Sequence, residues 1–202
     1  MSEKKRGRPR AFDAKVTLEK ARDVFWDRGF AGTSLDTLSA ATQLNRPSLY
    51  GAFGDKEALY LDVMEAYRAE SMDVLADALD LSLPLRDNLA RVYKSALEIY
   101  LHGKTSARGC FLISTATAEA IQHERVRDLL SRSLEDFDGA IEQRMALAVE
   151  RGELPDGSDV HMLARLASAV MHSLAVRARA GDSRETLEAL AKSGVDMICG
   201  KV

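Results

Sequence analysis

Apolar residues recur at intervals of three and four along most of the chain, which is the pattern of amphipathic helices. Asp13 is a good N-cap and Gly29 is a common helix end, so a first helix is expected between them. A second helix is expected from Thr33 or Ser34. The apolar positions of these two helices are Val16, Leu18, Ala21, Val24, Phe25, Trp26, Leu35, Leu38 and Ala41.

Residues 45–53 are expected to form a third helix with a polar reading edge. Asn45 can cap this helix, and Pro47 is tolerated only in its first turn. Arg46 and Ser48 then project from the N-terminal end, which a helix-turn-helix inserts into the major groove of DNA. Residues 43–45 would form the preceding turn, and the residues that point back into a three-helix core would be Leu44, Leu49 and Phe53.

Beyond residue 54 the pattern remains helical, with little sign of strands. Asp55 starts a long helix to about residue 80, and the next helix begins at Pro84 and ends near Tyr100. Further helices are expected over residues 110–121, 124–150, 159–180 and 183–199, with a loop at 103–109. The predicted fold class is all-α, with about nine helices. The expected parts are a basic arm at 1–12, a helix-turn-helix domain at 13–54 and a larger helical domain at 55–202.

Charge is distributed unevenly along the chain, whose net charge is −3. Residues 1–60 hold 11 Lys/Arg against 8 Asp/Glu, whereas residues 61–202 hold 17 against 23. The basic end includes Gly7-Arg8-Pro9-Arg10, a segment of the type that enters minor grooves, so Arg8 and Arg10 are predicted DNA contacts. The alternative is a solvated tail that only aids solubility.

The composition is ordinary for a globular helical protein, with 46% hydrophobic and 29% charged residues. No stretch reaches the ~20 apolar residues of a membrane span, and the N-terminus lacks the apolar core of a signal peptide. Cys110 and Cys199 offer neither a disulfide framework nor a metal-ligand spacing. These features favour a reducing cytoplasm and no membrane partner.

The N-terminal pattern resembles the tetracycline-repressor (TetR) family of one-component transcription regulators. The similarity covers roughly residues 11–62. It rests on Gly29-Phe30, Thr33-Ser34, Arg46-Pro47-Ser48-Leu49-Tyr50 and Phe53-Gly54-Asp55-Lys56-Glu57-Ala58-Leu59. One departure is Gln43, where this family often has glycine. If the turn needs a positive φ, Gln43 adds up to about 1 kcal/mol of strain.

The resemblance implies a homodimeric repressor that a small-molecule inducer releases from a palindromic DNA operator, although activators share the fold. The larger helical domain would then sense the ligand and form the dimer. Arg46 would read a base edge, preferably guanine, and Pro47 and Ser48 would contact bases or methyl groups. The residues expected to hold phosphates are Thr33, Ser34, Tyr50 and Lys56.

The helix over residues 160–180 is apolar around more of its circumference than packing on one core requires. A four-helix bundle made with the last helix and the symmetry mates of both would cover the second face. The alternative is a large monomer core that surrounds this helix. The predicted dimerisation residues are Leu163, Leu166, Val170, Leu174, Leu187 and Leu190.

No catalytic or metal-binding motif can be identified in the sequence. His102, His123, His161 and His172 have no metal-ligand spacing, and neither a nucleophile elbow nor a phosphate loop occurs, so we expect no enzyme and no cofactor. Apolar walls with a few hydroxyls describe a small-molecule pocket, and the family binds inducers in its middle helices. The candidate pocket residues, each of which could instead be core, are Tyr93, Leu97, Tyr100, Cys110, Ser114 and Thr117.

Cys110 has two interpretations. At the start of a helix, next to Arg108, its thiolate would be stabilised and could sense electrophiles or oxidants. The Gly109-Cys110 pair is similar to one in electrophile-responsive repressors of the family. The other interpretation is a buried and inert thiol.

Two further classes of function remain open from the sequence. An architectural DNA binder without a ligand would share the basic arm and the helix-turn-helix but would lack a closed pocket. An enzyme on a helical scaffold would need convergent titratable side chains within residues 55–202.

Overall fold

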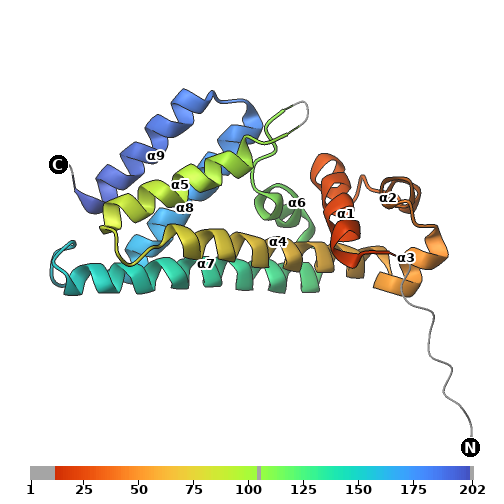
Figure 1. The fold of residues 1–202 in the computed structure, drawn as a ribbon, viewed down its shortest axis with the longest axis horizontal. Helices are drawn as coiled ribbons and strands as arrows, with labels where there is room; N and C mark the ends of the chain where they lie inside the picture. Colours follow the sequence, from red (N-terminus) through yellow and green to blue (C-terminus); the bar gives the residue numbers. More distant parts are fainter. Residues whose placement is uncertain (1–11, 104–105, 201–202) are drawn as a thin grey trace, which may run out of the picture. The chain divides into compact units, whose positions relative to one another are not determined.

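The computed structural model describes residues 12–103 and 106–200. Over these residues the chain forms nine α-helices and no strand, which confirms the predicted all-α fold class (Figure 1). Contacts divide the chain into two compact units, Met1–Val63 and Met64–Val202. The division falls inside helix α4 (Lys56–Ala78), a few turns beyond the boundary expected between residues 54 and 55.

In the first unit, α1 (Ala14–Arg28), α2 (Leu35–Thr42) and α3 (Arg46–Phe53) all begin at polar caps. The side chains of Asp13, Ser34 and Asn45 each accept a hydrogen bond from a backbone N–H of the following first turn. Such a cap stabilises a helix by about 1 kcal/mol, which is why these starts could be predicted from residue type. Ser34, rather than Thr33, is the cap of α2.

An aromatic cluster forms much of the core of the first unit. The ring centroids of Phe25 and Tyr60 lie 5.0 Å apart, and those of Phe30 and Tyr60 lie 5.1 Å apart. Leu38 of α2 and Leu49 of α3 are buried as well. Because Tyr60 belongs to α4, the first turns of α4 are part of this core.

The turn between α2 and α3 contains a strained residue. Gln43 has φ 61° and ψ 24°, in the left-handed region, and it is the one non-glycine residue with a positive φ in the described part of the chain. A side chain in this conformation crowds its own backbone, at a cost of about 1–2 kcal/mol relative to glycine. The turn therefore has at Gln43 the positive φ that the sequence analysis raised as a possible source of strain.

We predict that Gln43→Gly raises the free energy of unfolding by up to about 1 kcal/mol. Relief of strain would exceed the extra entropy that glycine gives to the unfolded chain. Gln43→Ala is the matched control, because alanine keeps the Cβ that causes the crowding and should give no gain. Urea denaturation of the three proteins measures the difference, and equal stability of the Gly and Ala variants would contradict the strain.

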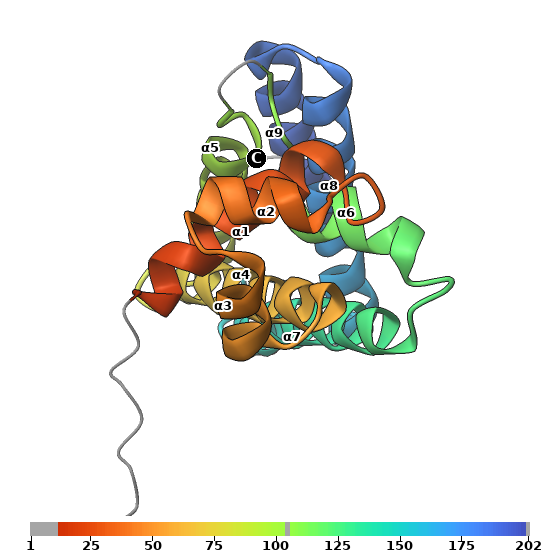
Figure 2. The same cartoon turned by 90° about the vertical axis from the view of Figure 1, so that its right-hand side faces the viewer.

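The second unit contains the rest of α4 and five more helices. These are α5 (Leu85–Tyr100), α6 (Phe111–Glu119), α7 (Glu124–Glu150), α8 (Val160–Ala180) and α9 (Arg184–Cys199). α8 packs against α5, α7 and α9, and α5 also packs against α9 (Figure 1). The short α6 packs against α7 and α8 (Figure 2). The starts expected at Pro84, Asp159 and Ser183 all agree with the structure.

A buried polar network joins the ends of three helices in this unit. The side chain of Arg144 on α7 is only 1% exposed, and its Nε donates to Asn88 Oδ1 on α5 at 2.6 Å. Its Nη2 donates to Glu153 Oε2 at 3.0 Å and to the carbonyl of Leu83 at 2.9 Å. Asn88 in turn donates to the carbonyl of Ala78, the last residue of α4, at 3.1 Å. Loss of one partner would leave an unpaired buried charge, at a cost of about 3–5 kcal/mol.

Among the described residues, no helix is long and apolar enough to cross a membrane.

Candidate nucleic-acid interface and ligand cavity

The N-terminal part of α3 presents a polar edge to solvent. Arg46, Pro47, Ser48 and Tyr50 are all exposed, whereas Leu49 is buried and holds the helix against its own unit. The Asn45 cap and Pro47 in the first turn fix where this edge begins. The four predicted DNA contacts on α3 are therefore together and accessible.

Arg46 forms an ion pair across the two helices of the motif. Its Nε and Nη2 donate to Asp36 Oδ1 at 3.0 and 2.5 Å, and Asp36 lies in the first turn of α2. The hydrogen bond and charge of Asp36 raise the pKa of Arg46. Both side chains stay more than half exposed. The pair leaves the Nη1 N–H groups and one Nη2 N–H of Arg46 for another acceptor.

Asp36 was missed in the sequence as a site residue. An acidic residue in a first turn is explained by the helix dipole alone, so it gave no separate signal.

Thr33 does not present its side chain for a phosphate, so that prediction is wrong. The residue is 2% exposed, and its Oγ1 donates to the carbonyl of Gly29 at 2.6 Å. The hydroxyl stabilises the turn after α1 instead. Ser34, one residue later, is exposed, and its Oγ caps α2.

Lys56 has partners within the first unit. Its Nζ donates to the carbonyls of Phe30 at 3.0 Å and Thr33 at 3.1 Å, and it lies 4.1 Å from the centroid of the Phe30 ring. These contacts tie the first residue of α4 to the connection between α1 and α2. Two of the three ammonium hydrogens are used, so a phosphate contact, which stays a prediction, has one donor left. Arg8 and Arg10 lie outside the described residues.

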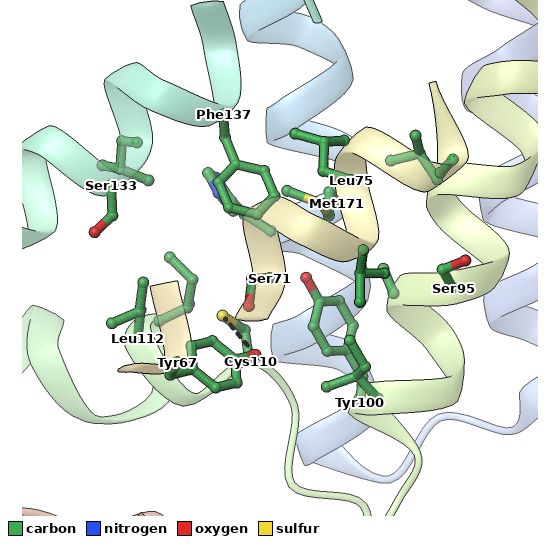
Figure 3. A pocket seen from close by; sticks show the side chains of 18 residues that line it. Tyr67, Ser71, Leu75, Ser95, Tyr100, Cys110, Leu112, Ser133, Phe137 and Met171 are labelled. Atoms are coloured by element: carbon green, nitrogen blue, oxygen red, sulfur yellow. Dashed lines mark hydrogen bonds between the residues drawn. The ribbon is translucent and has the colours of Figure 1, made fainter. Parts of the chain in front are cut away.

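A cavity lies within the second unit, between α4, α5, α7, α8 and the start of α6 (Figure 3). The space open to the centre of a water-sized sphere is about 60 Å³. Two of the predicted pocket residues line it, Tyr100 and Cys110. Its other aromatic and polar lining residues are Tyr67, Ser71, Ser95, Ser133, Phe137 and His172.

Four predicted pocket residues do not line this cavity. Tyr93 is buried elsewhere, and its hydroxyl donates to the carbonyl of Ala167 at 3.2 Å. Tyr93 and Tyr100 share a helix face, but seven residues separate them by about 10 Å along the axis, so they meet different neighbours. Leu97 is buried, and together with Tyr93 it lines a separate pocket between α5 and α9. Ser114 Oγ donates to the carbonyl of Arg108, and Thr117 Oγ1 donates to the carbonyl of Ile113.

The residues missed by the sequence come from helices far apart in the chain. Tyr67 and Ser71 lie on α4, Ser133 and Phe137 on α7, and His172 on α8. Each one alone looks like an ordinary member of an amphipathic helix. Only the packing of the helices brings them together.

Cys110 is held in the wall of this cavity. Gly109 has φ 68°, and a Cβ there would come within 2.5 Å of the Ala175 carbonyl oxygen, so glycine lets the chain approach α8 closely. Cys110 then begins α6, and the Tyr67 hydroxyl lies 3.7 Å from its Sγ. Burial raises the pKa of the Cys110 thiol and outweighs the backbone N–H groups at the start of α6, which lower it. This supports the buried-thiol interpretation.

We predict that Cys110 reacts slowly with iodoacetamide in the folded protein at pH 7. The thiolate is the reactive form, so a raised pKa lowers its population at neutral pH, and the rate should keep rising beyond pH 8.5. We expect modification about tenfold or more slower than in the urea-unfolded chain. Peptide mass spectrometry separates Cys110 from Cys199, and faster reaction in the folded state would contradict the assignment.

The structure divides the predicted dimerisation residues into three groups. Leu174 and Leu187 are 0% exposed within one subunit, so they belong to its core and their prediction as interface residues is wrong. Leu163, Val170 and Leu190 are half-buried, and Val170 packs closely on Gly194 of α9. Leu166 is 41% exposed. Periodicity could not show which apolar face of α8 the subunit itself covers.

The exposed polar edge of α3, on a compact unit of short capped helices, defines a helix-turn-helix protein with a helical second unit. The family "Bacterial regulatory proteins, tetR family" matches residues 18–63, and "Tetracyclin repressor-like, C-terminal domain" matches residues 86–193. The chain belongs to the TetR family of DNA-binding transcription regulators.

Relatives with known roles or structures agree with this assignment. The HTH-type transcriptional repressor ComR of Escherichia coli K12 is 28% identical over 193 residues, covering 93% of this chain and 90% of ComR. A cysteine mutant of the TetR family transcriptional regulator CifR, solved in complex with 26-bp double-stranded operator DNA, is 32% identical with a TM-score of 0.84. The match to CifR covers 94% of this chain and 98% of that chain.

Proposed function

We propose that this protein is a homodimeric repressor that binds a palindromic operator and leaves it when a small-molecule inducer enters the cavity of the second unit. The observation that carries the proposal is the exposed edge of α3, with Arg46 at its N-terminal end. The operator complex of the similar regulator CifR supports operator binding by this protein. The proposal places the protein in the cytoplasm with its operator and assigns it no catalytic activity.

Arg46 is the residue that we propose to read a guanine in each half-site. Its outer N–H groups can donate to guanine O6 and N7 while Asp36 still accepts from Nε and Nη2. Asp36 would thus hold the guanidinium plane in one orientation. Its carboxylate would also repel the DNA phosphates at every sequence. Only at an operator would the contact of Arg46 with guanine offset this repulsion.

We predict that Arg46→Ala removes about 1–3 kcal/mol of discrimination at one base pair per half-site. Asp36→Asn should strengthen binding to scrambled DNA, because it removes a negative charge, and should reduce the preference for the operator. Glu19→Gln, on α1, controls for the change in charge alone. Titrations on operator and scrambled DNA at several salt concentrations measure both effects, and equal losses on both DNAs for Arg46→Ala would exclude it from base reading.

The exposed apolar residues of the C-terminal helices support the dimer. Met162, Leu166, Ala169 and Val176 on α8 are exposed and follow intervals of four, three and seven residues, which places them in one stripe. Met197 of α9 is 64% exposed. A two-fold contact that pairs this surface with itself would cover both helices and form the expected four-helix arrangement.

We predict that Leu166→Glu combined with Val176→Glu gives a folded monomer with operator affinity reduced at least about a hundredfold. Unpaired carboxylates are costly to bury in the contact, and a monomer that binds one half-site alone loses the gain from bivalent binding. Ile121→Glu, another exposed apolar position, should remain dimeric. Sedimentation should give twice the 22.2 kDa chain mass for the wild type and for this control. A wild type that is monomeric at micromolar concentration would refute the dimer.

A further inference from the structure

Among the described residues, no acidic, lysine or arginine side chain lines the cavity. Burial lowers the pKa of His172, the one basic group in the wall, so its imidazole is neutral at pH 7. The remaining polar groups are hydroxyls and the Cys110 thiol, set among aliphatic and aromatic side chains.

Some of the polar groups in the wall have partners within the chain. Ser133 Oγ donates to the carbonyl of Leu129 at 2.7 Å, and the Tyr67 hydroxyl donates to Cys110 Sγ. Tyr100 is different. It is 4% exposed, its hydroxyl has no hydrogen bond within the described part of the chain, and it points into the cavity (Figure 3).

The Tyr100 hydroxyl can donate a hydrogen bond to a molecule bound in the cavity. Burial raises its pKa well above 10, so the phenol keeps its proton at neutral pH. The hydroxyl faces the cavity and has no hydrogen bond to the described part of the chain, so it is free to donate to an acceptor bound there. A ligand that accepts from Tyr100 therefore gains more than its apolar surface alone would provide.

The size of the cavity limits the ligand. About 60 Å³ of space open to the centre of a water-sized sphere is room for several water molecules. A compact molecule of similar volume, such as a single six-membered ring, fits this space.

We propose that the cavity binds a small uncharged molecule with an apolar body and one hydrogen-bond acceptor, which the Tyr100 hydroxyl contacts. This inference rests on the proposed inducer site and specifies its ligand class. An anion or a cation of the same size is excluded, because it would lose its hydration without meeting an opposite charge.

Four ring-sized probes test the proposal by calorimetry on the full-length protein without DNA. Cyclohexanone should bind with a dissociation constant in the millimolar range or below. Methylenecyclohexane, which has the same shape without the acceptor, should bind about three- to tenfold more weakly. Cyclohexylammonium and cyclopentanecarboxylate should show no binding at the same concentrations.

Two tyrosine variants distinguish the contribution of the Tyr100 hydrogen bond from that of the ligand's shape. Tyr100→Phe should abolish the advantage of cyclohexanone over methylenecyclohexane and leave the hydrocarbon bound. Tyr93→Phe, on the same helix but with its hydroxyl bonded to Ala167 in the core, should keep that advantage. Thermal unfolding of both variants establishes that they are folded.

The proposal is overturned if no neutral probe binds at millimolar concentration, if a charged probe binds as well as the ketone, or if Tyr100→Phe keeps the ketone preference. An operator-release assay with cyclohexanone is scored separately. Binding that follows the pattern above without release of DNA would count against the inducer mechanism and not against the ligand class.

Discussion

Helix α4 (Lys56–Ala78) has to supply side chains to two cores, because the boundary between the two compact units falls inside it. Its first turns supply Tyr60 to the aromatic cluster around Phe25. Its later turns supply Tyr67 and Ser71 to the wall of the cavity. Lys56, the first residue of the same helix, donates to the carbonyls of Phe30 and Thr33.

The second unit holds its polar groups in two contrasting ways. At the junction of α4, α5 and α7, Arg144 is buried with its Nε and Nη2 bonded to Asn88, Glu153 and a carbonyl, so this region is fixed by directional contacts. In the cavity, Tyr100 is equally buried, but its hydroxyl lacks a bond in the described part of the chain.

The first unit contains an ion pair between α2 and α3. Arg46 is exposed and paired with Asp36, so a carboxylate on the neighbouring helix orients its guanidinium. An exposed ion pair adds little to stability, which makes orientation its more important effect. The strained residue Gln43 ends α2, and Asn45, two residues later, caps α3.

The sequence by itself determined the helices, their starts and the family. Caps such as Asp13, Asn45 and Ser183 act on backbone groups within three residues, so residue type and position were sufficient to locate them. Tertiary structure decided which side chains meet. Tyr93 and Tyr100 have the same pattern, yet one is bonded in the core and the other faces a cavity, because different helices cover the two ends of α5. Tertiary packing also buries Leu174, leaves Leu166 exposed and places Asp36 next to Arg46. Contacts between distant segments leave no pattern in the local sequence, so these outcomes could not be predicted from it.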